Sequence, residues 1–182
     1  MKKTGLLLLF CIILTITFNL CYSNSPNEVI QQVNEGESIK KIREEYKIIN
    51  SDTSYLIIEK DLEDLSTEGG TLVSYYKKNI LKKAVILIYG EMGKKTMEYY
   101  YKNGNVIFVF VKEYFYDSPI YDEGFKISYT DDNRYYFHQN KLIKWIDDKR
   151  VNRNIYDVKS LQIGTEIIND AVNIINRSNI SN

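Results

Sequence analysis

The sequence predicts an α+β domain in which a twisted antiparallel meander of about seven to eight strands carries a helix packed on it at each end of the chain. Strand-length runs of alternating or apolar residues follow one another over residues 55–147, separated by short polar turns. On either side, residues 26–49 and 155–176 have apolar side chains at helical spacing. We expect residues 24–182 to form a single domain, with both helices covering one face of the sheet.

Residues 1–23 have the features of a signal peptide. Two lysines precede a long apolar segment, and Cys21 and Ser23 are small residues at the −3 and −1 positions of a cleavage site. The apolar segment is shorter than the roughly 20 residues that span a bilayer, which argues against an uncleaved anchor. In an alternative interpretation Cys21 is acylated and starts a mature lipoprotein, although Leu20 stands where that processing favours a small residue. Both interpretations predict an exported protein, either periplasmic or secreted.

The cysteine and charge content restrict the function further. Both cysteines, Cys11 and Cys21, lie in the leader, so a mature chain starting at Asn24 has no disulfide, thiolate metal site or cysteine nucleophile. Without Lys2 and Lys3, 22 basic and 24 acidic residues give a formal charge of −2. Such a chain gives no electrostatic reason to expect nucleic acid as a partner. We expect a protein or a small ligand of the cell envelope, and membrane contact only through the alternative lipid anchor.

A capping box starts the first helix, with Ser25 at the N-cap, Pro26 at N1 and Glu28 at N3. Gly36 weakens the middle of this segment by about 1 kcal/mol relative to alanine. We therefore expect one interrupted helix over residues 26–49, or two short ones. Further along, apolar residues resume the stripe that faces the sheet, and charged residues are expected mostly on the other side. These charged residues are Lys40, Lys41, Arg43, Glu44 and Glu45.

The longest predicted strands form a hairpin over residues 94–116. Asn103-Gly104 separates them, and Asn-Gly favours a type I′ turn, which needs φ > 0 at both central residues. The first strand alternates between apolar and polar residues, but the second is apolar on both sides. Val109 and Phe110 point to opposite faces of this second strand, and we predict that both are buried. A strand of this kind belongs in the middle of a sheet.

The remaining strands are shorter. The segment AVILIY, within residues 80–89, is apolar on both sides and predicts a second central strand. Residues 131–133, Asp-Asp-Asn, are interpreted as a turn between two strands. The strands other than the long hairpin are predicted at residues 55–59, 71–77, 80–89, 125–130, 134–138 and 141–147.

Three hairpins share one sequence pattern of two aromatic residues, a polar turn and an apolar restart. They read YYKKNIL from Tyr75, YYKNGNV from Tyr100 and YFHQNKL from Tyr136. This pattern resembles the tyrosine-rich YY-x-NG hairpins of repeat-containing bacterial proteins. More closely, residues 66–116, with STEGG, YGEMGK and EYYYKNGNVIFVF, are similar to a set of uncharacterised exported bacterial proteins. The resemblance covers about a third of the chain. It implies an envelope or secreted protein and brings no known activity or site residues.

Tyrosine is abundant, with sixteen in the chain, most of them between Tyr55 and Tyr136. A sheet with one half-exposed aromatic face accounts for this, because aromatic pairs stabilise neighbouring strands. The alternative is a recognition surface, since tyrosine is enriched where protein partners dock.

Residue types suited to catalysis are sparse. His138 is the single histidine, and acid–base or metal chemistry needs partners near it. No zinc-protease, phosphate-loop or serine-hydrolase motif is present in the sequence. We therefore expect no cofactor and no metal, and the sequence favours a non-catalytic role over an enzymatic one without deciding between them. Paired carboxylates for glycoside hydrolysis have no short signature, so a carboxylate-dependent hydrolase is the third hypothesis.

Loops on a rigid scaffold are common binding sites, and a meander of this kind places three loops at one edge of its sheet. Turn chemistry alone also selects the polar residues found there. The leading hypothesis is a non-catalytic binding or envelope-associated protein. The alternative is a carrier or inhibitor that holds a ligand between the sheet and its helices. The candidate binding residues at this edge are Glu68, Glu91, Asp117, Tyr121, Asp122 and Glu123.

Overall fold

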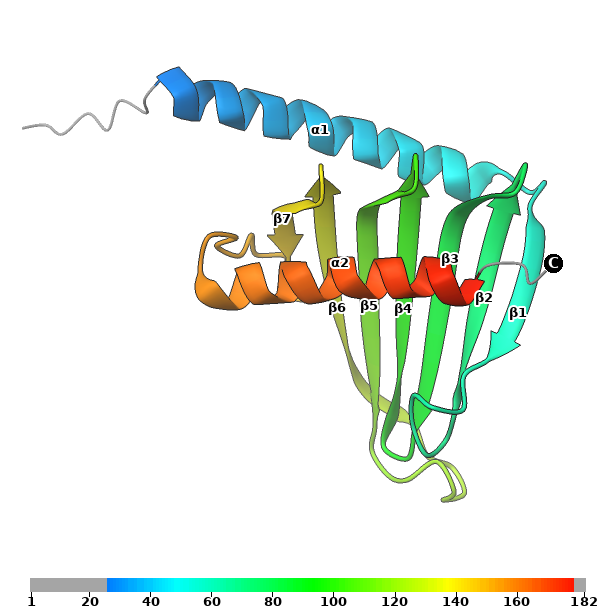
Figure 1. The fold of residues 1–182 in the computed structure, drawn as a ribbon. Coiled ribbons are helices and arrows are strands. Elements are labelled where there is room, and N and C mark those ends of the chain that lie inside the picture. Colours follow the sequence, from blue (N-terminus) through cyan, green and yellow to red (C-terminus); the bar gives the residue numbers. More distant parts are fainter. Residues whose placement is uncertain (1–25, 179–182) are drawn as a thin grey trace, which may run out of the picture.

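The computed structural model describes residues 26–178 and shows a sheet with two long helices (Figure 1). Helix α1 (Pro26–Ser51) precedes the strands and helix α2 (Val158–Ser178) follows them. The predicted signal peptide, Cys21 and the N-cap residue Ser25 lie outside the described residues. The strands are β1 (Leu56–Asp61), β2 (Gly70–Lys77), β3 (Ile80–Gly90), β4 (Gly93–Lys102), β5 (Asn105–Tyr116), β6 (Ile127–His138) and β7 (Lys141–Ile146).

The seven strands form one antiparallel sheet in the order of the chain, from β1 to β7. The predicted α+β meander is therefore confirmed, and β3 and β5 both lie inside the sheet, as their apolar sequences indicate. Helix α1 runs through Gly36 without interruption. Neither of the helices within residues 26–178 is long and apolar enough to cross a membrane.

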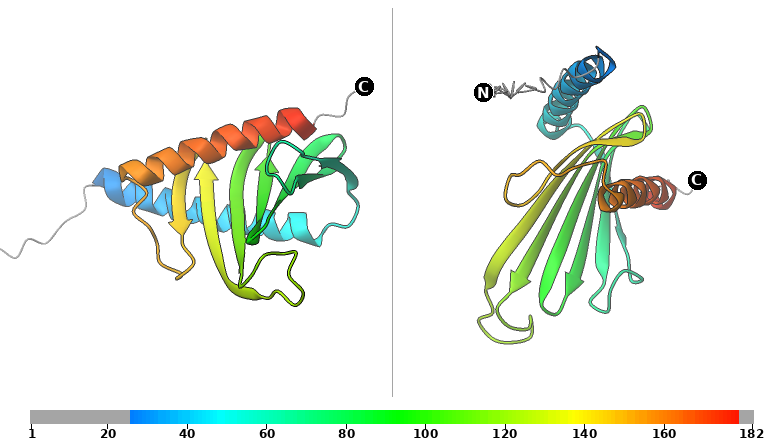
Figure 2. Two further views of the ribbon diagram at one scale, coloured as in Figure 1. Left: turned by 90° about the horizontal axis from the view of Figure 1, so that it is seen from below. Right: turned by 90° about the vertical axis from the view of Figure 1, so that its left-hand side faces the viewer.

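The two helices lie on opposite faces of the sheet (Figure 2). Successive residues of β4 show this arrangement: Tyr100 packs in a cluster with α1, whereas Tyr99 and Tyr101 pack in the cluster that contains α2. The expectation that both helices cover one face was wrong. The physical reason is that the central strands carry large apolar side chains on both faces, and each face needs its own cover.

The three hairpins with a common sequence pattern also share one backbone structure. The two turn residues have φ between 49° and 76° in all three, at Lys78-Asn79, Asn103-Gly104 and Gln139-Asn140. Positive φ at both positions is the signature of the type I′ turn predicted for Asn103-Gly104. Two residues before each turn the pairing register shifts, which leaves one extra residue in the returning strand. The repeated sequence is thus a repeated turn followed by a repeated bulge.

The paired aromatics of these hairpins join the sheet to the helices. The second aromatic of each pair, Tyr76, Tyr101 or Phe137, is buried on the face that α2 covers. The Tyr101 hydroxyl donates a hydrogen bond to the Ala171 carbonyl at 3.1 Å, and the Tyr76 hydroxyl donates to the Ser178 carbonyl. These tyrosines therefore fix helix α2 and are not members of a half-exposed aromatic face.

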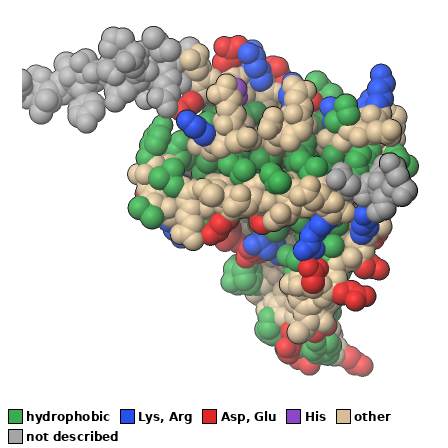
Figure 3. Space-filling model, in the orientation of Figure 1, with side chains coloured by type: hydrophobic (Ala, Val, Ile, Leu, Met, Phe, Trp, Pro, Cys, Tyr) green, Lys and Arg blue, Asp and Glu red, His purple; other side chains and the backbone are tan. Residues whose placement is uncertain are grey.

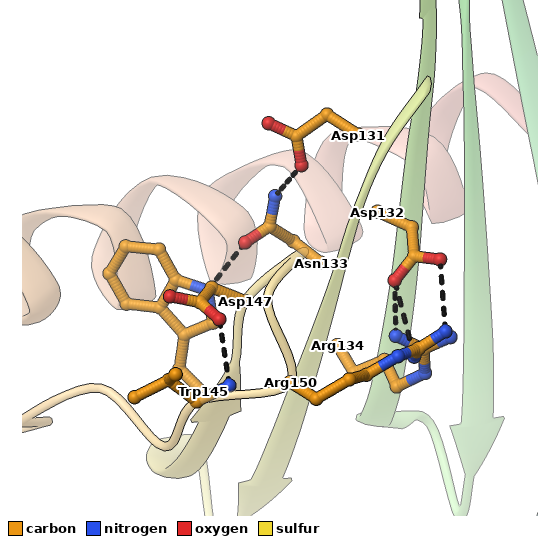
Figure 4. A network of polar contacts seen from close by, with 8 residues as sticks. Asp131, Asp132, Asn133, Arg134, Trp145, Asp147 and Arg150 are labelled. Carbon is orange, nitrogen blue, oxygen red and sulfur yellow. Dashed lines mark hydrogen bonds and ion pairs between the residues drawn. The ribbon is translucent and has the colours of Figure 1, made fainter. Parts of the chain in front are cut away.

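Residues 131–133, predicted as a turn, are part of one continuous strand, β6. They pair with β5, with Asp131 opposite Glu113. Neighbouring side chains satisfy their polar groups (Figure 4): Asn133 accepts a hydrogen bond from Trp145 Nε1 at 2.7 Å and donates one to Asp131 at 3.0 Å. The predicted turn was wrong because pairing with β5, together with these side-chain hydrogen bonds, outweighs the turn preference of aspartate and asparagine.

Candidate functional site

A cleft of about 330 Å³ lies between α1 and the sheet, over the half of the sheet that carries the three hairpin turns. We call it the α1 cleft. Aromatic side chains of β5 and β6 form its floor, and about one and a half turns of α1 form its wall. The residues that line it are Ile42, Arg43, Tyr46 and Lys47 of α1, Phe108 and Phe110 of β5, and Arg134 and Tyr136 of β6.

The floor of the α1 cleft is a set of aromatic rings in mutual contact. Phe108 and Tyr136 are opposite each other in the β5–β6 ladder, and their ring centroids lie 4.9 Å apart. Both are buried, and Tyr46 of α1 meets Phe108 edge-on at 5.3 Å. Such contacts limit the movement of the rings and give the cleft a preformed apolar surface.

Phe110 shows where the cover of α1 ends. Both Val109 and Phe110 were predicted to be buried, and Val109 is fully buried on the α2 face. Phe110 is only partly buried, because it lies two residues further along β5 than Phe108, a distance of about 7 Å. That distance takes it to the edge of α1, so its ring faces the cleft.

Three cationic side chains surround this aromatic floor. Arg43 and Lys47 are four residues apart on α1, which places them on the same side of the helix. The Arg43 guanidinium carbon lies 5.8 Å from the centroid of Tyr136. The Arg134 guanidinium carbon lies 5.0 Å from the centroid of Phe110, and Arg134 is also paired with Asp132 (Figure 4). These distances are typical of cation–π contacts.

The charge of the α1 cleft is positive. No acidic side chain lines it. Neither Arg43 nor Lys47 forms an ion pair within the part of the chain whose side chains are described, residues 34–178. Asp132 offsets the charge of Arg134 and is shared with Arg150, whose Nη1 lies 3.3 Å from it. The arrangement suits an anionic group beside an apolar or aromatic one.

The predicted loop edge is a separate region, at the end of the sheet far from α1. The structure brings together three of the candidate residues: the Tyr121 hydroxyl donates a hydrogen bond to Glu68 Oε1 at 2.5 Å, and the Ile120 amide donates to the Glu91 carbonyl at 2.9 Å. The hydrogen bond to Glu68, reinforced by the charges of Glu68 and Glu91, raises the pKa of Tyr121 to about 12. Whether these residues bind a partner stays a prediction.

The other three candidate residues shape the loop that connects β5 and β6. The Asp117 carboxylate accepts a hydrogen bond from the Lys126 amide at 2.7 Å, which closes the base of the loop. The Asp122 amide donates to the Pro119 carbonyl at 2.9 Å, and Glu123 is exposed. The Asp117 side chain and the Asp122 backbone therefore help to hold the local structure of this loop.

Sequence reasoning did not single out the cations of the α1 cleft. Arg43 was assigned to the charged side of the helix, whereas it lies beside the apolar stripe of Ile42 and Tyr46. The sequence signal that could have indicated this site is the spacing of Arg43 and Lys47, which are four residues apart and adjoin that stripe. Nothing in the sequence indicated that Arg134 would join them, because this depends on the pairing of β6 with β5.

The distribution of carboxylates and of the single histidine bears on the hydrolase and metal hypotheses. A carboxylate-dependent hydrolase needs two facing carboxylates, and the α1 cleft is lined by none. Within residues 26–178, no three histidine, cysteine, aspartate or glutamate residues gather where they could hold a metal ion. His138 is exposed at the end of β6.

The fold defines the chain as an α+β protein, a seven-stranded antiparallel meander with one helix on each face. Comparison of the chain with protein-family models, with curated proteins and with solved structures gave no match. The resemblance to exported bacterial proteins with tyrosine-rich hairpins stays a prediction.

Proposed function

We propose that this protein is a non-catalytic binding protein that holds a small anionic ligand with an aromatic or apolar body in the α1 cleft. The observation that carries the proposal is the position of Arg43, Lys47 and Arg134 around an aromatic floor. The cleft volume of about 330 Å³ lies within the range of roughly 300–1,000 Å³ common for small-molecule sites.

Each part of the cleft matches one part of such a ligand. The buried rings of Phe108 and Tyr136, with the partly buried Phe110, provide an apolar surface on which a flat or aliphatic body can pack. Arg43 and Lys47 lie at the rim of the cleft, where they can donate charge-assisted hydrogen bonds to a carboxylate, sulfonate or phosphate group of the ligand. A neutral or cationic ligand would leave Arg43 and Lys47 without this compensation.

The predicted leader supports a location in the cell envelope or outside the cell. An exported binding protein with a preformed cleft fits a carrier, or a protein that captures its ligand for a partner. The leader lies outside the described residues, and export is part of the proposal.

The test uses naphthalene-2-sulfonate as an anionic aromatic probe and 2-naphthalenemethanol as its neutral counterpart. We expect the wild-type protein to bind the sulfonate more tightly than the alcohol in calorimetric titrations. The double variant Arg43→Gln/Lys47→Gln should lose at least about tenfold in affinity for the sulfonate, which corresponds to ~1.4 kcal/mol. Its affinity for the alcohol should change little.

The matched control is Lys40→Gln/Lys41→Gln. Both lysines are exposed on the same helix and do not line the cleft, so this variant has the same net charge as the cleft variant. An equal loss of sulfonate affinity in both double variants would show a general charge effect and not a site. Absence of sulfonate binding by the wild-type protein would contradict the proposal directly.

A second candidate function rests on the loop edge. Several large apolar side chains there are exposed, beside Glu68 and Glu91, and the space-filling view shows hydrophobic and acidic side chains together at this tip (Figure 3). Exposed aromatic residues and methionine are enriched in protein interfaces. This surface, the loop-edge patch, favours capture of a protein partner. Its exposed apolar residues are Met92, Tyr121, Phe125, Ile127 and Tyr129.

A further inference from the structure

The face of the sheet that carries the α1 cleft is covered by a helix at one end only. Helix α1 crosses this face near the three hairpin turns (Figures 1 and 2), and Phe110 is the last ring along β5 that packs with α1. Alternate residues of a strand share one face, so Lys112 and Tyr114 follow Phe108 and Phe110 on this side of the sheet. Both are partly exposed. From Phe108 to Tyr114 the strand spans about 20 Å, which is long enough for a site that extends beyond the α1 cleft.

Two lysines occupy the uncovered end of this face. Lys94 is opposite Tyr114 in the β4–β5 ladder, and the ammonium groups of Lys94 and Lys112 both lie 4.8 Å from the centroid of Tyr114. Neither lysine forms an ion pair within residues 34–178. Two positive charges are therefore held around one ring, without a carboxylate of the chain to compensate them.

Two arginines connect these lysines to the α1 cleft. Asp132 is opposite Lys112 in the β5–β6 ladder, and its carboxylate is paired with both Arg134 and Arg150 (Figure 4). One negative charge is thus shared by two guanidinium groups and lies beside a third cation. We call the whole surface the cationic track. Its cations are Arg43 and Lys47 at the α1 end, Arg134 and Arg150 in the middle, and Lys112 and Lys94 at the far end.

The excess of positive charge on the cationic track is local. Glu113 and Asp131, the acidic neighbours in β5 and β6, are opposite each other in the ladder and lie on the other face, because successive side chains alternate. Glu113 is also paired with Lys95 at 2.8 Å. A line of cations with so few carboxylates beside it attracts a ligand that carries several anionic groups in a row. The cationic track therefore suits a linear polyanion.

The aromatic rings of the track distinguish between two classes of polyanion. Single-stranded nucleic acids stack their bases on free aromatic faces. Here Arg134 lies 5.0 Å from the centroid of Phe110, and two lysines lie over Tyr114, so cations of the chain occupy these rings. Hydroxyl-bearing side chains share the same two rows of the ladder, at Thr96 and Thr130. This combination favours a polymer with many hydroxyl groups and no bases.

We propose that the cationic track binds a linear acidic polysaccharide. The anionic groups of the polymer pair with the lysines and arginines, and its hydroxyl groups lie beside the threonines. The predicted leader also favours a polymer that is met outside the cell. This inference rests on the proposed function at one end of the track, where the α1 cleft takes the anionic group and the apolar ring face of one sugar unit.

The test uses hexagalacturonate, a linear sugar chain with a carboxylate on each ring, and its methyl ester, which has the same chain without the charges. In calorimetric titrations we expect the wild-type protein to bind hexagalacturonate at least about tenfold more tightly than the ester or the galacturonate monomer, because linked groups bind together. Lys94→Gln/Lys112→Gln should weaken binding of the hexamer by about tenfold and lower its salt dependence. The affinity for naphthalene-2-sulfonate should not change, since neither lysine lines the α1 cleft.

The matched control is Lys141→Gln/Lys159→Gln. Both lysines are exposed and belong to β7 and α2, outside the cationic track, so this variant has the same net charge as the track variant. It should bind hexagalacturonate as the wild type does. Melting curves without ligand show whether each variant is folded. If the track variant is not folded, the single variants Lys94→Gln and Lys112→Gln take its place.

Three results would overturn the proposal: absence of hexagalacturonate binding by the wild-type protein, an equal loss of affinity in the two double variants, or binding of single-stranded hexathymidylate as tight as that of hexagalacturonate. The last result would favour nucleic acid. The two proposals can also fail separately. Binding of the hexamer that depends on Lys94 and Lys112, without binding of naphthalene-2-sulfonate, would contradict the α1 cleft alone. The reverse result would contradict the cationic track alone.

Discussion

Removal of a single hydroxyl from either of two neighbouring tyrosines should have opposite effects on stability. Tyr99 and Tyr101 lie on the same strand and the same face, and they are 0% and 1% exposed. The Tyr99 hydroxyl has no hydrogen-bond partner among residues 26–178, whereas the Tyr101 hydroxyl donates to the Ala171 carbonyl at 3.1 Å. An unpaired buried polar group costs about 1–3 kcal/mol, and a paired hydroxyl contributes about 0.5–1.5 kcal/mol. In the absence of added ligand, Tyr99→Phe should therefore raise the free energy of unfolding and Tyr101→Phe should lower it.

The expected difference between the two variants is about 2–3 kcal/mol. For a domain of this size each kcal/mol shifts the melting temperature by about 2–4 °C, so the two melting temperatures should differ by roughly 4–12 °C. Urea unfolding followed by circular dichroism gives the free energies directly, and an unchanged slope with denaturant shows that the unfolding reaction is the same. Equal destabilisation by both substitutions would refute the reasoning, since it would mean that the Tyr99 hydroxyl is paired in the folded protein.

Three further predictions follow from burial, ionisation and the loop edge. Val109 is fully buried, so Val109→Asp should abolish cooperative folding, which circular dichroism would detect as the absence of a melting transition. Burial, together with nearby carboxylates, raises the pKa of Tyr135 to about 12, against about 10 in the unfolded chain. The stability that the neutral phenol contributes is therefore complete below about pH 10 and is lost as the pH rises towards 12. The free energy of unfolding of Tyr135→Phe, measured from about pH 9 to 12, should fall less steeply with pH than that of the wild type. Glu68→Gln/Glu91→Gln should change the free energy of unfolding by no more than about 0.5–1 kcal/mol, because both side chains are exposed. In pull-downs at two ionic strengths, the variant should capture less of an envelope protein than the wild type, and its capture should depend less on salt. Unchanged capture would contradict the assignment of the loop-edge patch as a partner site.

The meander could be predicted because its signals are local. Asn103-Gly104 marks one turn, and the apolar runs on both sides mark central strands. The turns at Lys78-Asn79 and Gln139-Asn140 have the same backbone with weaker sequence signals, and similarity to the first hairpin was the clue to them. Local signals failed at residues 131–133, where partners from β5, β7 and the loop after it satisfy side chains that otherwise favour turns.

The candidate sites could not be predicted in the same way, because they depend on which face each helix covers. Arg43 and Arg134 are far apart in the sequence, and they lie around one cleft only because α1 crosses the β5–β6 ladder on that face. Tyr99 has the same sequence surroundings as Tyr100 and Tyr101. The Tyr100 hydroxyl pairs with Asn50 of α1 and the Tyr101 hydroxyl with Ala171 of α2, so the positions of the two helices decide the pairing, and no short pattern records them.

The position of α2 itself follows from two matching distances: the spacing of small residues along the helix and the spacing of the hairpins across the sheet. The helix contacts the hairpins through small residues that are seven positions apart: the Ser178 carbonyl accepts from Tyr76 and the Ala171 carbonyl from Tyr101. Gly164, seven positions earlier, lies against Leu142 of the third hairpin. Seven residues of α-helix span about 10.5 Å, and two strands of a sheet span about 9.5 Å, so each step along the helix reaches the next hairpin.

This match predicts that the small residues hold the helix at its distance from the sheet. Ala171 is 2% exposed, and a larger side chain there has to displace α2 and break the Tyr101 hydrogen bond. Ala171→Leu should therefore lower the free energy of unfolding by about 2–4 kcal/mol, from overpacking and one lost hydrogen bond. Val172→Leu, one residue further on and 53% exposed, should change it by less than about 0.5 kcal/mol. Equal free energies of unfolding for these two variants, measured in urea, would show that α2 is not held by this spacing.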